Sequence, residues 1–387
     1  MLPIVCIQIT FFVLCAAAHG TAFVRWQKWS AEQKKGSWPL YGWFTAISCI
    51  GSAAGALAFA ARVSQFAYRY PRQKSEQLTN RTFEDDKRVS DFRDFELRGA
   101  SAFFIFFPIE AWFVTVAQLL MLHRIFRFSL SGSRQKRAWG MCGRIFFTIV
   151  NAVYLSGVLC NVTAATYLIE GAVVSRKVVN AYVDNDIVSA KNYEVSALSM
   201  VGRGASLFGI QRFLEAVVLI IVITAFLITG FNCHRIIMSA LRTLFSAEQK
   251  VSIISGAAAG QARELVHQAG SEGKLLHRKV VGTVLVVFAT VLLRSFYSIL
   301  YALALYFNQI SNPCSRSECD PCKNVFSHIL SWMLYTPFFE QGIMLFASPL
   351  AQLVALWGMS GVRAMEQIKV EQNHLSSNLK TGASSRL

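Results

Sequence analysis

Residues 280–307, VVGTVLVVFATVLLRSFYSILYALALYF, decide the fold of this chain. The stretch holds a single charged side chain, Arg294, and is otherwise almost entirely apolar. A helix rises about 1.5 Å per residue, so a helix of this length exceeds the roughly 30 Å hydrocarbon core of a bilayer. We therefore interpret the stretch as a membrane-spanning helix with a cation near its midpoint.

Stretches of the same kind recur along the chain and predict seven spans. They lie at residues 2–24, 40–61, 100–122, 145–169, 213–233, 280–307 and 325–358. Each is too long and too continuously apolar for the alternating strands of a membrane barrel. Apolar residues make up 54% of the 387 residues and charged residues 16%, a balance that excludes a soluble globular domain. We expect an all-α polytopic transmembrane bundle of seven helices over residues 1–358.

The distribution of Lys and Arg predicts that the N-terminus is outside and the C-terminus cytoplasmic. With this orientation the inner segments hold 21 basic and 6 acidic residues, and the outer segments hold 16 and 13. The net charge of +16 therefore reflects topology and attraction to anionic lipid, and it does not imply nucleic acid. The polar tail at residues 359–387 is expected to be cytoplasmic and disordered. The segment after residue 233 is expected to continue the fifth helix along or beyond the membrane surface.

The first apolar stretch has an alternative interpretation, because Ala16, Ala17 and Ala18 resemble the small residues of a signal-peptide cleavage site. Basic residues follow this stretch and do not precede it, which favours a retained first helix. Cleavage would instead leave six helices and reverse every loop.

Two features of the predicted outer loops agree with this orientation. Asn80 opens an Asn-Arg-Thr sequon and is expected to be glycosylated. Cys314, Cys319 and Cys322 crowd the short segment before the last span, where an oxidising environment favours a disulfide. The odd cysteine either stays free or pairs with Cys6.

Three ionisable residues lie near the middle of predicted spans and form the candidate ligand-binding site: Glu110, Arg294 and Glu340. A charge at this depth is costly, so such residues normally face each other or a polar site. Consecutive helices can pair Arg294 with Glu340, and Glu110 lies at similar depth. Glu215 is expected to reach water at the outer interface. Pro337 and Pro349 bracket Glu340 and predict kinks that free backbone carbonyls.

Signatures of soluble enzymes are absent from the sequence, which contains no Walker loop, dinucleotide-binding glycine motif, nucleophile elbow or HExxH pair. We expect no cofactor, no metal site and no catalytic residues. An intramembrane enzyme is a third alternative that rests only on the midplane carboxylates. A short stripe of small residues, Gly51, Gly55 and Ala58, is expected to pack against another helix of the bundle.

The last two predicted spans, at residues 292–297 (LLRSFY) and 332–335 (WMLY), resemble the Rta-like lipid-translocating exporters of fungi. That resemblance implies a seven-helix protein linked to the movement or sensing of lipids. The chain departs from the family at Ser298 and Tyr301, where the family tends to carry a second arginine and a glutamate. The sequence is also similar to plant seven-helix proteins that support tobamovirus multiplication and to related animal orphan receptors.

The leading hypothesis is an integral protein of the plasma membrane or endomembranes that handles or senses a lipid-like or small amphipathic ligand through the midplane polar cluster. The alternative is a seven-helix receptor or scaffold that binds a cytoplasmic signalling partner through its basic inner loops. In that alternative the midplane charges are purely structural. Membrane lipids are partners under either hypothesis.

Overall fold

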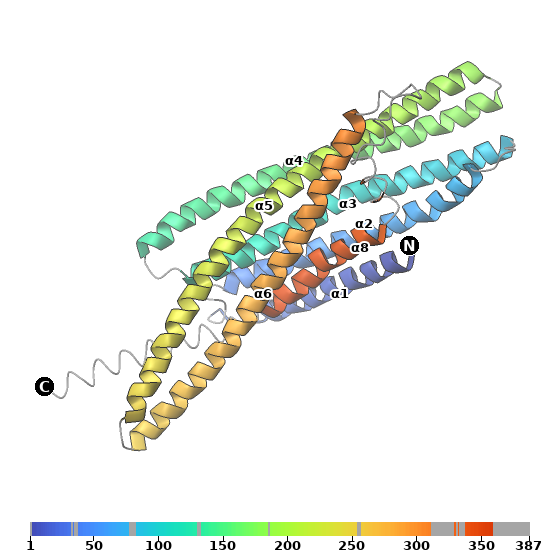
Figure 1. Cartoon of the computed structure of the whole chain (residues 1–387). Helices are drawn as coiled ribbons and strands as arrows, with labels where there is room; N and C mark the ends of the chain where they lie inside the picture. Colours follow the sequence, from blue (N-terminus) through green and yellow to red (C-terminus); the bar gives the residue numbers. More distant parts are fainter. Residues whose placement is uncertain are drawn as a thin grey trace.

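The computed structural model describes residues 2–31, 34, 38–76, 83–129, 133–184, 186–253, 257–310, 329, 332 and 337–358. The regular elements within these ranges are all helical (Figure 1). The long helices are α1 (Leu2–Gln27), α2 (Trp38–Glu76), α3 (Phe83–Ser129), α4 (Ser133–Val183), α5 (Ile187–Ile253) and α6 (Ala257–Ile310). A final segment begins with α8 (Pro337–Leu345), passes through the π-helix η2 (Phe346–Leu350) and stays helical to residue 358.

Seven helices in the described residues are long and apolar enough to cross a membrane, which confirms the predicted all-α seven-span bundle. Successive helices run in opposite directions (Figure 1). We call the end of the bundle where α1 begins the N-terminal end, and the other the opposite end. The sidedness of the two ends remains a prediction from the distribution of basic residues.

Several helices are much longer than the predicted spans. The 67 residues of α5 correspond to roughly 100 Å, about three times the thickness of the hydrocarbon core. The α4–α5 hairpin therefore projects at the N-terminal end and the α5–α6 hairpin at the opposite end (Figure 1). The second projection confirms the expectation that the fifth helix continues beyond residue 233.

The helix that contains the fifth predicted span is longer than that span at both ends. The apolar helix begins at Ile187 and not at residue 213. Buried alanines at positions 172 and 181 of α4 and 190 and 197 of α5 give a physical reason. Small side chains let two helices pack closely, so this hairpin stays helical beyond the most apolar stretch.

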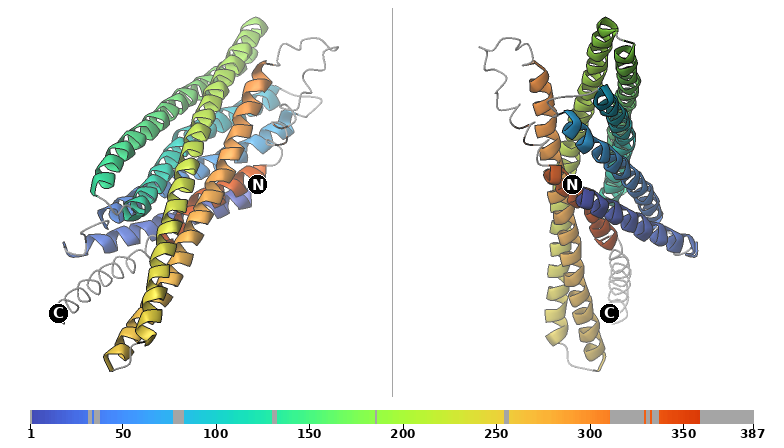
Figure 2. Two further views of the ribbon diagram at one scale, coloured as in Figure 1. Left: turned by 60° about the vertical axis from the view of Figure 1, so that its left-hand side comes forward. Right: turned by 90° about the vertical axis from the view of Figure 1, so that its right-hand side faces the viewer.

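The final segment packs against α1 and α6 (Figure 2). Pro337 is the first residue of α8, a position where proline's missing N–H leaves no bond unmade. Pro349 lies inside η2, and its carbonyl accepts a hydrogen bond from Cys15 Sγ at 3.7 Å. The π-helical turn at Pro349 departs from regular α-helical bonding, and the carbonyls that the two prolines were expected to free remain a prediction.

In the half of the bundle nearer the N-terminal end, aromatic side chains fill the core, including Phe12, Phe59, Phe103 and Phe107. Gly55 lies directly against the ring of Phe12, where a Cβ would stand 2.3 Å from a ring carbon. The small-residue stripe of α2 thus serves close packing within the bundle, as expected.

Candidate functional site

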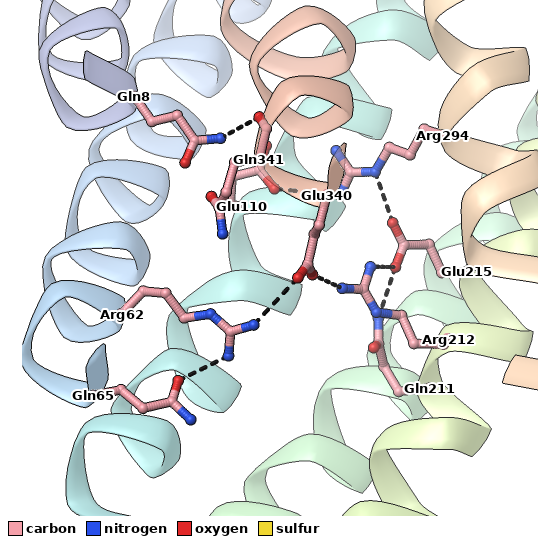
Figure 3. A network of polar contacts seen from close by, with 10 residues as sticks. All are labelled: Gln8, Arg62, Gln65, Glu110, Gln211, Arg212, Glu215, Arg294, Glu340 and Gln341. Atoms are coloured by element: carbon pink, nitrogen blue, oxygen red, sulfur yellow. Dashed lines mark hydrogen bonds and ion pairs between the residues drawn. The ribbon is translucent and has the colours of Figure 1, made fainter. Parts of the chain in front are cut away.

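Three arginines and three glutamates form one continuous chain of ion pairs through the bundle (Figure 3). The chain runs in the order Arg62, Glu340, Arg212, Glu215, Arg294, Glu110. We call it the ion-pair ladder. Its charges alternate strictly and sum to zero, so each buried charge has an opposite neighbour.

The ladder joins five helices that are far apart in the sequence. Arg62 comes from α2, Glu340 from α8, Arg294 from α6 and Glu110 from α3. The two central members come from α5, where their i, i+3 spacing puts them on one face. The ladder therefore fixes the relative positions of most of the bundle.

One end of the ladder is sealed from solvent. Arg294 Nε donates to Glu215 Oε1 at 2.8 Å, and Arg294 Nη2 donates to Glu110 Oε2 at 3.4 Å. The three side chains are between 0% and 4% exposed. The hydroxyl of Ser348, in the π-helix, donates to Glu110 Oε1. Loss of the Arg294–Glu110 pair would leave the buried Glu110 carboxylate without an opposite charge, which is strongly unfavourable.

The middle of the ladder is held by Arg212. Its Nη1 donates to Glu215 Oε2 at 3.4 Å, and its Nη2 donates to Glu340 Oε1 at 3.3 Å. The guanidinium also lies over the ring of Phe107, 4.3 Å from the centroid. Aromatic faces stabilise a desolvated cation, so this arginine is supported by rings as well as by carboxylates.

The other end of the ladder reaches the surface. Arg62 Nη2 donates to Glu340 Oε2 at 3.2 Å, and Arg62 Nη1 donates to Gln65 Oε1 at 2.8 Å. The side chain of Arg62 is 17% exposed and that of Glu340 is 11% exposed, more than any other ladder member. We call this pair the open end.

Buried polar atoms without a hydrogen-bond partner among the described residues surround the open end and the middle of the ladder. They are Gln8 Oε1, Arg62 Nε, Gln211 Oε1, Arg212 Nε, Tyr297 OH and Gln341 Oε1. In Figure 3 the amides of Gln8 and Gln341 both lie to one side of Glu340. Gln8 Nε2 donates to the backbone carbonyl of Gln341 at 2.6 Å, which leaves its oxygen available. Each buried unmade bond costs about 1–3 kcal/mol, so the cluster is suited to receive further polar groups.

The structure brings two of the three predicted site residues together. Glu110 and Arg294 form a direct pair. Glu340 pairs with Arg62 and Arg212, and not with Arg294 as expected.

The expectation for Glu215 was wrong. This residue is 1% exposed and bonds two arginines, whereas the sequence suggested that it reaches water. Because α5 begins at Ile187, Glu215 lies well inside the helix and the bundle. Arg62 and Arg212 were not predicted as site residues. The one available signal was the spacing of Arg212 and Glu215 on a helix face that is otherwise apolar.

Other predicted residues lie outside the described part of the chain, namely Asn80, Cys314, Cys319 and Cys322. Cys6 is described, and it is an exposed free thiol. Among the described residues no group of three or more His, Cys, Asp or Glu side chains is arranged to hold a metal ion.

Comparisons with known proteins do not place the chain in a family. No protein-family model, no curated protein and no solved structure matches the chain. The resemblance to lipid-translocating exporters and orphan receptors therefore stays an expectation from a few residues.

Proposed function

We propose that this integral membrane protein handles or senses a small amphipathic or lipid-like molecule, whose polar head binds at the open end of the ion-pair ladder. The observation that carries the proposal is the group of unpartnered buried polar atoms around Glu340. Carboxamide oxygens of Gln8, Gln211 and Gln341 offer acceptors, and the Nε atoms of two arginines offer donors. A head with hydroxyl groups or paired charges would use both kinds.

The charge of the ladder restricts the chemistry of the ligand. Three arginines and three glutamates already balance, so a head with net charge would add an uncompensated charge in a poorly solvated place. An uncharged or zwitterionic head does not. The apolar part of the ligand would lie against partly buried aromatic side chains beside the open end, such as Phe66, whose ring centroid is 5.1 Å from the guanidinium of Arg62.

The ladder also provides a way for ligand binding to change how the helices pack. Glu340 is shared between Arg62 and Arg212, so a ligand that binds Glu340 competes with bonds to α2 and to α5. Weakening either bond would loosen α8 from one neighbour while the sealed end holds α3, α5 and α6 together. A ligand shifts such an equilibrium only by its difference in affinity for the two arrangements.

Substitution of Gln341 separates a ligand site from a purely structural network. The side-chain amide of Gln341 makes no hydrogen bond to any described residue, and its Oε1 is buried. Gln341→Met should therefore raise the free energy of unfolding by about 1 kcal/mol, because it removes an unsatisfied buried oxygen. If the amide serves a ligand, the same change should weaken binding by about tenfold.

The matched control is Gln118→Met. Gln118 is also buried with an unpartnered Oε1, but it lies on α3 eight residues beyond Glu110, toward the opposite end. Binding of monooleoylglycerol and of lysophosphatidylcholine is measured by thermal shift of the full chain in detergent. We expect Gln118→Met to gain stability and keep binding, and Gln341→Met to gain stability and lose binding. Equal binding by both variants would overturn the proposal.

The competing function is a receptor or scaffold in which the ladder only locks the bundle. The α5–α6 hairpin favours it, because it projects past the other helices and offers a surface for a partner (Figure 1). In that case Gln341→Met would stabilise the protein with no change in binding of either amphiphile. Deletion of the hairpin tip would then be the change that abolishes function.

A further inference from the structure

A cavity of about 780 Å³ lies between α3, α4 and α5, away from the ladder. Its walls include Leu119 and Phe147, together with Ile220 and Thr224 of α5. Leu119 is nine residues beyond Glu110 on α3, a rise of roughly 13 Å toward the opposite end. The cavity volume falls within the range of about 300–1,000 Å³ that is typical of small-molecule sites.

The lining is almost entirely apolar, but it includes two residues that carry or can carry positive charge, His123 and Arg144. Arg144 is exposed and His123 is partly buried. The sequence contains no acidic residue between Glu110 and Glu170, the stretch that includes both of them. Arg144 therefore brings a positive charge to the lining of the cavity, and His123 can add a second when it is protonated.

The cavity opens to the lipid-facing surface of the bundle. Ile220 and Ile228 on its α5 wall are 47% and 54% exposed. Thr148 on the α4 wall is also exposed. Figures 1 and 2 show α4 and α5 side by side at the N-terminal end and diverging toward the opposite end. A molecule already dissolved in the bilayer can therefore enter between these two helices.

We infer that this cavity binds one acidic phospholipid from the leaflet at the opposite end of the bundle. The anionic head lies at Arg144 and His123, and an acyl chain lies against Leu119, Phe147 and Ile220. An apolar cavity with basic residues among its lining residues and an opening toward lipid matches a molecule with an anionic head and a long apolar tail. With the orientation predicted from the basic residues, this leaflet is the cytoplasmic one, which holds most anionic lipid.

The inference is independent of the proposed function, because the cavity contains no member of the ladder and selects an anionic head, whereas the ladder accepts an uncharged or zwitterionic one. It is tested with the full-length protein in detergent, titrated with dioleoylphosphatidylserine or dioleoylphosphatidylcholine. The quantity compared is the difference in apparent affinity between the two lipids, since they share their chains and differ in net charge. Thermal stability reports binding.

Two variants address the head and the tail separately. Arg144→Gln removes one exposed charge, and Thr224→Phe fills the apolar part of the cavity from a residue whose hydroxyl bonds only its own helix at Ile220. The controls are Arg203→Gln, an exposed arginine near the N-terminal end of α5, and Thr166→Phe, an exposed threonine of α4 outside the cavity lining.

We expect wild-type protein and both controls to prefer phosphatidylserine. Arg144→Gln should lower that preference by about tenfold, the size of one charge-assisted hydrogen bond. Thr224→Phe should weaken phosphatidylserine binding by a similar factor. Unchanged preference in both variants, or equal binding of the two lipids by wild type, would overturn the inference. Gln341→Met should leave the affinity for phosphatidylserine intact while it weakens binding of the zwitterionic amphiphiles, so a failure here is distinct from a failure at the ladder.

Discussion

Gly99 offers a sharp test of how closely α2 and α3 pack beside the open end of the ladder. A Cβ built on Gly99 would lie 2.8 Å from the backbone nitrogen of Gln65, 3.1 Å from its Cα and 3.2 Å from the carbonyl oxygen of Ala61. All three contacts are backbone atoms, which cannot rotate away. The turn of α2 that would have to shift also carries Arg62.

The cost of Gly99→Ala follows from this geometry. Overpacking against a rigid backbone costs typically about 1–3 kcal/mol. Replacing a helical glycine by alanine recovers about 0.5–1 kcal/mol through helix propensity. We therefore expect a net loss of roughly 1–2 kcal/mol in the free energy of unfolding, with weaker amphiphile binding because Arg62 moves relative to Glu340.

The matched control is Gly202→Ala on α5, where no atom lies within 4 Å of the new Cβ. That variant should gain about 0.5–1 kcal/mol. Denaturant titration in detergent, followed by far-ultraviolet circular dichroism, measures both. If the two alanine variants are stabilised equally, the close approach of α2 and α3 at Gly99 does not exist and the position of Arg62 is wrong.

Three further predictions concern the rest of the bundle. Asp94 of α3 is fully buried and bonds Arg176 of α4 at 2.5 Å, so Asp94→Asn should lower the free energy of unfolding by about 1–3 kcal/mol in the same titration, and no loss would exclude this link. Asp186 Oδ1 accepts the backbone N–H of Ser189 at the start of α5, and hydrogen bonds from the Ser189 hydroxyl and from this N–H hold the pKa of Asp186 below its usual value. Its stabilisation should be present at neutral pH and fade as the pH falls through that lowered pKa; hydrogen exchange of the first turn should show it and Asp186→Ala should abolish it. Asn80→Gln should remove a glycosidase-sensitive shift in gel mobility, whereas a protein without such a shift would leave the predicted orientation unsupported.

The spans were predictable because lipid imposes a local requirement that each segment meets by itself. Residues 280–307 show this, since length and apolarity alone identify a helix that the structure contains. The pairing of Glu110 with Arg294 could also be predicted from the sequence, because buried side chains of opposite charge at the same depth in the membrane normally pair.

The remaining members of the ladder depend on relations that no single stretch encodes. Glu215 was predicted at the interface because the most apolar run of the sequence starts at residue 213, whereas packing between small residues extends the helix back to Ile187. Arg62 lies just beyond the predicted end of its span and enters the site only because α2 continues. The cavity likewise depends on the divergence of two helices, which sequence periodicity does not report.

The most direct test of the ladder is to measure whether Arg294 is coupled to Glu215 or to Glu340. A double-mutant cycle combines Arg294→Met with Glu215→Gln, and a second cycle combines it with Glu340→Gln. The structure places Arg294 Nε 2.8 Å from Glu215, and it shows no bond between Arg294 and Glu340. We predict a coupling free energy of about 1–3 kcal/mol in the first cycle and at most about 0.5 kcal/mol in the second. A larger coupling to Glu340 than to Glu215 would contradict the ladder.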